Sequence, residues 1–208
     1  MSSKSIKNVI FDLGNVIVRW SPVEVIRLTF GDSERVNTIT KQIFQSPIWL
    51  SANRGELTEA EVQTALQKEF GLSAIQAKKI CYYVKHTQLV LFGSIELLRR
   101  VKDAGYNVYA LSDNVPEIVT HLKQQYDFWP LFDGVVISAD VGYLKPSPEI
   151  YQTLLEQYQL DAQECVFIDD MPYNVEGAQN IGMTAIQFQS AEQCERELKM
   201  LGILVDEE

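Results

Sequence analysis

Cysteines are few and long apolar stretches are missing in this chain of 208 residues. The three cysteines are widely spaced and form no C-x-x-C pair, and three thiols cannot all pair within one chain. This pattern is typical of reduced thiols in a cytoplasmic protein. No window reaches the roughly 18 consecutive apolar residues of a membrane-spanning helix, and no signal-peptide apolar region precedes the first apolar run. We therefore expect a cytoplasmic protein that does not insert into a membrane.

Positive charge is also in deficit. The chain has 18 lysines and arginines against 28 aspartates and glutamates, which gives a formal net charge of −10. Such a surface repels the nucleic-acid backbone and excludes nucleic acid as a general partner. An anionic substrate must then be held by a local group of cations or by a metal ion. The apolar fraction of 46% suffices for a substantial core, and we expect a monomer or a weak dimer.

Five short apolar runs predict the buried strands of a parallel sheet. Each run is rich in β-forming residues and does not alternate strictly with polar residues, as in strands that are covered on both faces. The runs span residues 7–11, 107–112, 134–138, 165–169 and 184–188. Helical patterns lie at 94–105, 116–126, 147–158 and 174–182, and another precedes the C-terminus. This alternation predicts a doubly wound, Rossmann-like α/β fold.

A long segment after the first predicted strand has no convincing strand of its own. Helix-capping boxes begin at Ser21 and Thr58, and a further helical pattern covers 73–87. We interpret this segment as an inserted all-helical cap, and its aromatic residues, among them Trp20, Phe44 and Trp49, as cap core, although Trp49 lies near the 53–58 turn and could face a ligand site. The predicted division is a cap at 19–88 and a core domain at 1–18 and 89–208.

Polar residues follow four of the predicted strands, and this edge of an open α/β sheet is where ligands bind. They are Asp12 after the first strand, Ser112-Asp113-Asn114 after the second, Lys145 after the third and Asp169-Asp170 after the fourth. Each has an ordinary explanation when taken alone, as a capping residue, a solvated turn or a surface lysine. Adjacent carboxylates, however, repel each other unless a cation or a proton lies between them. A hard divalent ion such as Mg²⁺ suits the acid pair. Prolines on both sides of Ser147 fix the backbone next to Lys145, and a lysine aimed in this way suits a phosphate.

Taken in chain order, the acid, hydroxyl, lysine and paired acids resemble the four motifs of the haloacid dehalogenase-like hydrolases, most of which are phosphatases. The matching segments are FDLGN (11–15), ALSDN (110–114), LKPSP (144–148) and FIDDMPYN (167–174). The helical insertion resembles the cap of the C1 subgroup of that superfamily. Within the superfamily, DLGNVIV, NRGELT and FIDDMPYNVEGA look most like the bacterial α-D-glucose-1-phosphate phosphatase group.

The resemblance implies a nucleophile and a metal site. Asp12 would attack phosphorus and form an aspartyl-phosphate, which water then hydrolyses. Mg²⁺ would be held by Asp12, the backbone carbonyl of Gly14 and Asp170, with Asp169 behind them. Asn174 is expected to cap the following helix rather than to orient Asp170.

The resemblance also implies how a small phosphorylated metabolite, such as glucose 1-phosphate, is bound. Ser112 and the backbone amide of Asp113 would bind phosphate oxygens, and Lys145 would neutralise both the phosphate and the nucleophile. Arg54 in the cap could contact a sugar hydroxyl or the phosphate. The acidic side chain of Asp113 departs from the asparagine that relatives often carry, and it would oppose an anionic substrate unless it points away.

A second departure lies at Gly14, where most phosphatases of the superfamily carry an aspartate that protonates the leaving oxygen. Three outcomes are open: the leaving group needs little help, a cap acid such as Glu56 supplies the proton, or the protein is a poor phosphatase or none. Haloacid dehalogenases also lack this aspartate, but they need no Mg²⁺ and lack the acid pair, which favours phosphoryl transfer. The remaining alternatives are a phosphonate hydrolase with a cap lysine and a non-catalytic module that binds a sugar phosphate.

Overall fold

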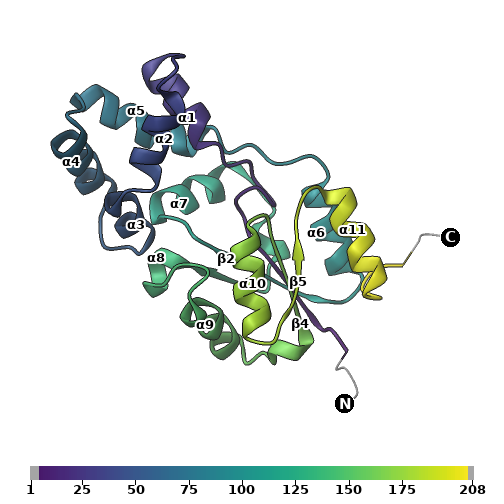
Figure 1. Cartoon of the computed structure of the whole chain (residues 1–208). Coiled ribbons are helices and arrows are strands. Elements are labelled where there is room, and N and C mark those ends of the chain that lie inside the picture. Colours follow the sequence, from purple (N-terminus) through teal and green to yellow (C-terminus); the bar gives the residue numbers. More distant parts are fainter. Residues whose placement is uncertain (1–4, 206–208) are drawn as a thin grey trace.

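The computed structural model describes residues 5–205, and within them five parallel strands form one sheet (Figure 1). The strands are β1 (Asn8–Phe11), β2 (Asn107–Ser112), β3 (Gly134–Ile137), β4 (Cys165–Asp169) and β5 (Thr184–Gln187). Their order across the sheet is β3-β2-β1-β4-β5, so β1 lies in the middle. All four neighbouring pairs are parallel. The predicted Rossmann-like fold class is confirmed.

Helices cover both faces of the sheet, which explains why the strands are apolar throughout. One face packs on α9 (Pro148–Tyr158) and α10 (Pro172–Asn180), in a cluster that includes Ile10 and Phe167. The other face packs on α6 (Ser94–Asp103), α7 (Pro116–Gln125) and α11 (Ala191–Met200), in a cluster that includes Phe11 and Ile168. Successive residues of one strand therefore belong to different clusters, as the period of a strand requires.

Five of the six helices between β1 and β2 form a helical block, a name used below for residues 22–86 (Figure 1). They are α1 (Pro22–Phe30), α2 (Val36–Phe44), α3 (Pro47–Asn53), α4 (Glu59–Phe70) and α5 (Ala74–His86). Reciprocal capping boxes start α4 at Thr58 and α5 at Ser73, and Gly71 ends α4 in the left-handed conformation. The sequence patterns do not single out α2 and α3. The division into a core at 1–18 and 89–208 and a cap at 19–88 stays a prediction, which these helices support.

The two chain segments that join the helical block to the sheet run side by side. Arg19 N–H donates to Leu89 O at 2.8 Å, and Leu91 N–H donates to Ile17 O at 2.9 Å. An antiparallel bridge between Val18 and Val90 lies between these bonds. The block is therefore attached to the carboxyl end of β1 through a paired double connection.

Three short helices complete the described elements, namely α8 (Ser138–Val141), η1 (Trp129–Leu131) and η2 (Ala162–Glu164). All three cysteines are buried and free of disulfides. Burial raises the pKa of each thiol to about 12, so the thiols are inert at neutral pH. Within residues 5–205, none of the helices combines the length and the apolar character that crossing a membrane requires.

Candidate active site

The register of β1 and β4 places two acids next to each other. Phe11 pairs with Ile168, and the N–H of Asp12 donates to Ile168 O at 2.9 Å. Asp12 and Asp169 therefore leave the sheet as neighbours. The strand order reverses between β1 and β4, and such a reversal opens a ligand-binding crevice at the carboxyl ends of the strands.

Lys145 lies between these two acids. Its Nζ is 2.9 Å from Asp12 Oδ1, 2.6 Å from Asp169 Oδ2 and 3.2 Å from Leu111 O. The lysine side chain is only 1% exposed. Burial lowers the pKa of the ammonium, but Asp12, Asp169 and Asp113 outweigh burial and raise it above the ordinary value. Lys145 therefore stays charged at neutral pH.

Asp169 uses both of its oxygens for contacts within the protein. Oδ1 accepts from Met171 N–H at 2.8 Å, and the side-chain amide of Asn174 donates to Oδ1 at 3.0 Å and to Oδ2 at 3.1 Å. The expectation that Asn174 caps a helix is wrong, because α10 begins two residues earlier and the Asn174 amide holds Asp169 instead. Asp169 is thus a supporting group behind the site.

Asp170 is oriented by a residue that the sequence analysis did not single out. Asn15 donates from Nδ2 to Asp170 Oδ2 at 3.1 Å and accepts from Trp20 N–H at 2.9 Å. Asn15 has a φ of +53°, a left-handed conformation that asparagine tolerates better than most residues. The signal in the sequence is the Gly-Asn pair after Asp12, which marks a turn.

The three acids fit a divalent cation. One carboxylate oxygen from each of Asp12, Asp169 and Asp170 lies within 4.8 Å of the other two. Three ionised carboxylates and the single ammonium of Lys145 leave a charge of −2, which Mg²⁺ would cancel. Without a cation, burial raises the pKa of Asp12 to about 7, and the charge of Asp169 adds to the effect against the opposing influence of Lys145. Among the described residues, neither Asp12 Oδ2 nor Asp170 Oδ1 forms a hydrogen bond with another residue, so both oxygens are open to a ligand.

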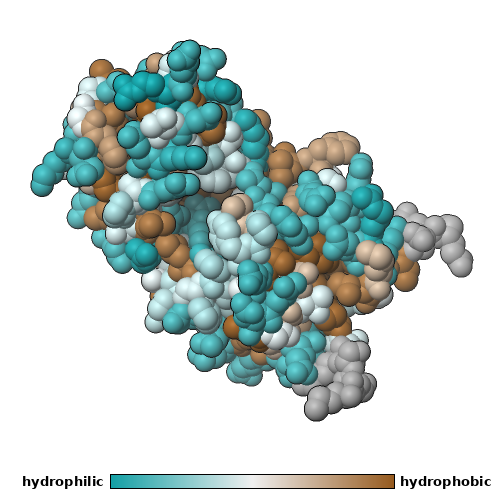
Figure 2. Space-filling model, viewed as in Figure 1, coloured by the Kyte–Doolittle hydropathy of each residue, from teal (hydrophilic) through white to brown (hydrophobic). Residues whose placement is uncertain are grey.

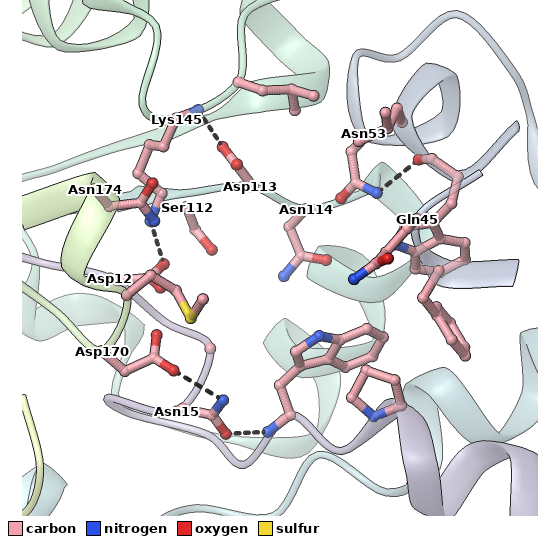
Figure 3. A pocket seen from close by; sticks show the side chains of 18 of the residues that line it. Asp12, Asn15, Gln45, Asn53, Ser112, Asp113, Asn114, Lys145, Asp170 and Asn174 are labelled. Atoms are coloured by element: carbon pink, nitrogen blue, oxygen red, sulfur yellow. Dashed lines mark hydrogen bonds and ion pairs between the residues drawn. The ribbon is translucent and has the colours of Figure 1, made fainter. Parts of the chain in front are cut away.

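A cavity of about 430 Å³ lies over these groups, between the strand ends and the helical block. On the face drawn in Figure 2, teal and white residues surround the central hollow together with some brown, hydrophobic ones. In the close view, the acids and Lys145 lie on one side, Gln45 and Asn53 of the helical block lie on the other, and Asn114 lies between them (Figure 3). Gly14 also lines the cavity, so its position is compatible with the predicted carbonyl ligand.

The 112–114 loop follows β2 and lines the cavity beside Asp12. Ser112 is almost fully buried. Asp113 Oδ1 accepts from Lys145 N–H at 3.1 Å, so this carboxylate is held by the protein backbone, and burial raises its pKa. The loop does not cap the next helix, because the N-cap of α7 is Val115 and no side chain caps it. Its hydroxyl and N–H groups are therefore not used as a helix cap.

The helical block and the two segments that join it to the sheet contribute aromatic rings and amides to the cavity. Trp20 stacks on Trp49 with ring centroids 6.0 Å apart, and Phe44 contacts both rings edge-on at 5.5 and 4.8 Å. These rings pack on the core and also line the cavity, so their interpretation as core alone is incomplete. The amide side chains in the lining from this side are Gln45, Asn53 and Gln88. Sequence analysis missed them because the unpredicted helices α2 and α3 carry most of this wall.

Two cap residues considered from the sequence do not line this cavity. Arg54 lies at the C-terminus of α3, and Glu56 is exposed in the following turn. Neither is among the residues that surround the cavity. The structure therefore brings together the acids, Lys145 and the 112–114 loop, but not Arg54.

These features define the class of the protein: a doubly wound α/β sheet with a helical insertion after β1 and a carboxylate–lysine cluster at the carboxyl edge. The family profile of the haloacid dehalogenase-like hydrolases matches residues 6–182, and the chain belongs to this family. The sesquiterpene phosphatase astK of Aspergillus oryzae is 30% identical over 184 residues, which cover 86% of this chain and 88% of that protein. The D-ribitol-5-phosphate phosphatase of Bacteroides thetaiotaomicron is 25% identical over 213 residues, which cover 94% of this chain and 98% of that protein.

Solved structures show the same fold. A haloacid dehalogenase family enzyme of Bacteroides thetaiotaomicron, crystallised with magnesium and inorganic phosphate, superposes with a TM-score of 0.73 at 23% identity, covering 89% of this chain and 96% of that chain. The L-2-haloacid dehalogenase of Xanthobacter autotrophicus superposes with a TM-score of 0.65 at 22% identity, covering 94% of this chain and 83% of that chain.

Replacing Lys145 by methionine should strongly destabilise the protein in magnesium-free buffer. The change leaves two buried carboxylates without their cation, which typically costs about 3–5 kcal/mol. Lys145 lowers the pKa of Asp12, so in the variant this pKa rises further above its unfolded value. The folded variant then keeps a proton on Asp12 that the unfolded chain has already released. The free energy of unfolding of the variant therefore falls as the pH rises through the folded pKa. Urea unfolding should therefore show a larger deficit at pH 8 than at pH 5.

Lys102→Met is the matched control, because Lys102 pairs with Asp133 at a site where both side chains are about one-third exposed. Such a pair contributes about 0–1 kcal/mol. Equal losses in the two variants would contradict a central role for Lys145.

Proposed function

We propose that the protein is a magnesium-dependent phosphoric monoester hydrolase with Asp12 as its nucleophile. The observation that carries the proposal is how the carboxylate of Asp12 is held at the cavity. Lys145 and Leu13 N–H hold its Oδ1, whereas its Oδ2 forms no hydrogen bond within the described structure. Asp12, Asp170 and the carbonyl of Gly14 would hold the ion, which neutralises charge on the incoming phosphate.

In the proposed reaction, Ser112 and the N–H of Asp113 bind phosphate oxygens while Lys145 offsets their charge. Asp12 Oδ2 attacks phosphorus, the bond from phosphorus to the leaving oxygen breaks, and that oxygen takes up a proton from water. Water then attacks the aspartyl-phosphate, which releases inorganic phosphate and restores the carboxylate. Lys145 keeps Oδ1 fixed throughout, so Oδ2 is the oxygen presented to the substrate.

We further propose a sugar phosphate such as glucose 1-phosphate as the substrate, in line with the narrower sequence resemblance. Sugars combine hydroxyl groups with apolar ring faces, and the cavity wall offers the amides of Gln45, Asn53 and Gln88 beside stacked tryptophan rings. The wall contributed by residues 20–88 contains no aspartate, glutamate or histidine within the described structure. A leaving group that departs without a strong acid, such as an anomeric oxygen, therefore suits this site best.

A second candidate is the phosphate of an apolar alcohol. The cluster of Trp20, Phe44 and Trp49 favours it, as does the likeness to a sesquiterpene phosphatase.

Carbon–halogen cleavage is less well supported. A dehalogenase needs no cation, so this reaction would not explain why Asp170 lies beside Asp12. A phosphonate hydrolase would need a cap lysine beside the nucleophile. Within the described helical block, Lys41 of α2 is the one lysine that lines the cavity, and its exposure to solvent does not favour this alternative.

A screen for phosphate release, run with and without Mg²⁺, tests the proposal directly. It includes hexose 1-phosphates, hexose 6-phosphates and farnesyl phosphate. We expect turnover of the 1-phosphates that depends on Mg²⁺ and disappears in Asp12→Asn. Release from farnesyl phosphate alone would favour the second candidate. Mg²⁺-dependent binding of sugar phosphates without release would identify a binding module, and release from 6-phosphates alone would refute the leaving-group argument.

Adding an acid at position 14 should extend the substrate range. Gly14 does not have a positive φ, and a Cβ there would meet Trp20 Cβ at 3.7 Å and Asp12 Oδ2 at 4.0 Å, which are ordinary contacts. General acid–base catalysis typically contributes about 10²–10⁴-fold. Gly14→Asp should therefore raise kcat for hexose 6-phosphates by at least about 10²-fold and for 1-phosphates by much less.

Gly14→Asn controls for size, because its amide has no proton of comparable acidity to give. If the aspartate and asparagine variants have the same kinetics, the missing acid does not limit the wild-type protein.

A further inference from the structure

Ser138 is a fully buried hydroxyl that the proposed reaction does not use. It begins α8 directly after β3. Its Oγ accepts from Asn114 N–H at 2.9 Å and donates to Asn53 O at 2.6 Å. One side chain thus satisfies a backbone donor and a backbone acceptor at once.

The two partners of Ser138 belong to opposite sides of the cavity. Asn53 is the last residue of α3 in the helical block, and Asn114 ends the 112–114 loop on the sheet side (Figure 3). Both residues line the cavity. The hydroxyl therefore connects the wall that faces the leaving group to the loop that is proposed to hold the phosphate.

A second acceptor lies within reach of the same hydroxyl. Asn114 O is 3.3 Å from Ser138 Oγ, farther than Asn53 O but still within hydrogen-bond distance. If the helical block moved away, the hydroxyl would turn to Asn114 O, and Asn53 O would be exposed to water. Separation therefore leaves neither Ser138 Oγ nor Asn53 O buried without a partner, which lowers the hydrogen-bond part of its cost.

The backbone beside Ser138 also fits the helical block closely. Gly55, in the turn after α3, has a φ of +74°, and a Cβ there would lie 2.2 Å from Ala139 O. No side chain fits into that space, so glycine lets the turn contact the backbone of α8. This contact brings Asn53 O to the hydroxyl.

We infer that Ser138 is a positioning residue that couples closure of the helical block to the geometry of the 112–114 loop, by exchanging its acceptor between Asn53 O and Asn114 O. With the block closed, Ser138 fixes both walls of the cavity. With the block open, it still holds Asn114 N–H. The coupling itself does not depend on the chemistry, and only its kinetic consequence rests on the proposed function.

Amide hydrogen exchange, followed by NMR on the full-length protein, tests the coupling without any substrate. In Ser138→Ala, the Asn114 amide and the amides of residues 50–57 should exchange about tenfold faster than in the wild type. Tyr158→Phe is the matched control, because the Tyr158 hydroxyl also accepts from a backbone N–H and donates to a backbone carbonyl, both of Val135, at 2.9 and 3.3 Å. It lies outside the cavity lining and should leave both segments unchanged.

Two further variants separate coupling from a general loss of structure. Ser138→Thr retains the hydroxyl and should restore slow exchange in both segments. Gly55→Ala obstructs closure but leaves the hydroxyl in place, so residues 50–57 should exchange faster while the Asn114 amide remains protected. The carbonyl carbon of Asn114 should shift in the NMR spectrum of this variant, because Asn114 O then accepts from Ser138 Oγ, and an unchanged shift would contradict the coupling. Unchanged exchange in Ser138→Ala, or the same pattern in Tyr158→Phe, would overturn the inference.

Kinetics supply the functional arm. On the substrate identified by the screen, Ser138→Ala should lower kcat/KM about tenfold, mainly through a higher KM, and Ser138→Thr should return it to within about threefold. Tyr158→Phe should change neither constant by more than about twofold. If no substrate is turned over, the proposed function fails while the exchange experiment still decides the coupling. If Ser138→Ala is active and its kcat/KM is unchanged, the positioning role of Ser138 in the reaction is contradicted.

Discussion

The buried ammonium of Lys145 is the interaction on which the rest of the site depends. It lies between Asp12 and Asp169 at distances of 2.9 and 2.6 Å, where water cannot stabilise the charges. One cation cannot balance three acids. Burial raises the pKa of Asp12 to about 7, and the charge of Asp169 adds to this effect while Lys145 opposes it. The acids thus fit a divalent cation, and in the proposed site one oxygen of Asp12 is fixed by Lys145 while the other is open to a substrate.

The sheet determines where this interaction can form. Because β1 lies between β2 and β4, Asp12, Ser112 and Asp169 leave adjacent strands at one edge. The segment after β3 adds Lys145 and Ser138 from the same edge, and the helical block closes the cavity from above. The two sides of the cavity therefore differ in chemistry: the sheet side provides the charged groups, and the opposite wall provides aromatic rings and amides.

The sequence predicts the sheet side well because its signals are local. Short apolar runs end in acids, and their order is enough to place Asp12, Lys145 and the acid pair at one edge. The cavity wall of the helical block is harder to predict, since α2 has no side-chain N-cap and α3, although it begins with Ser46 and Pro47, is only seven residues long. Asn53, Asn114 and Ser138 come together only in the tertiary structure, and Asn174 was assigned to the wrong partner for the same reason. The expected role of Arg54 rested on its nearness in sequence to a turn, which does not bring it to the cavity.

A crystal structure of the protein grown in magnesium tests the central claim most directly. We predict one ion with oxygen ligands from Asp12 and Asp170 at about 2.0–2.1 Å, while Asp169 stays bound to Lys145 and Asn174. The account is contradicted if no ion binds at saturating magnesium, or if an ion binds there without Asp12 as a ligand.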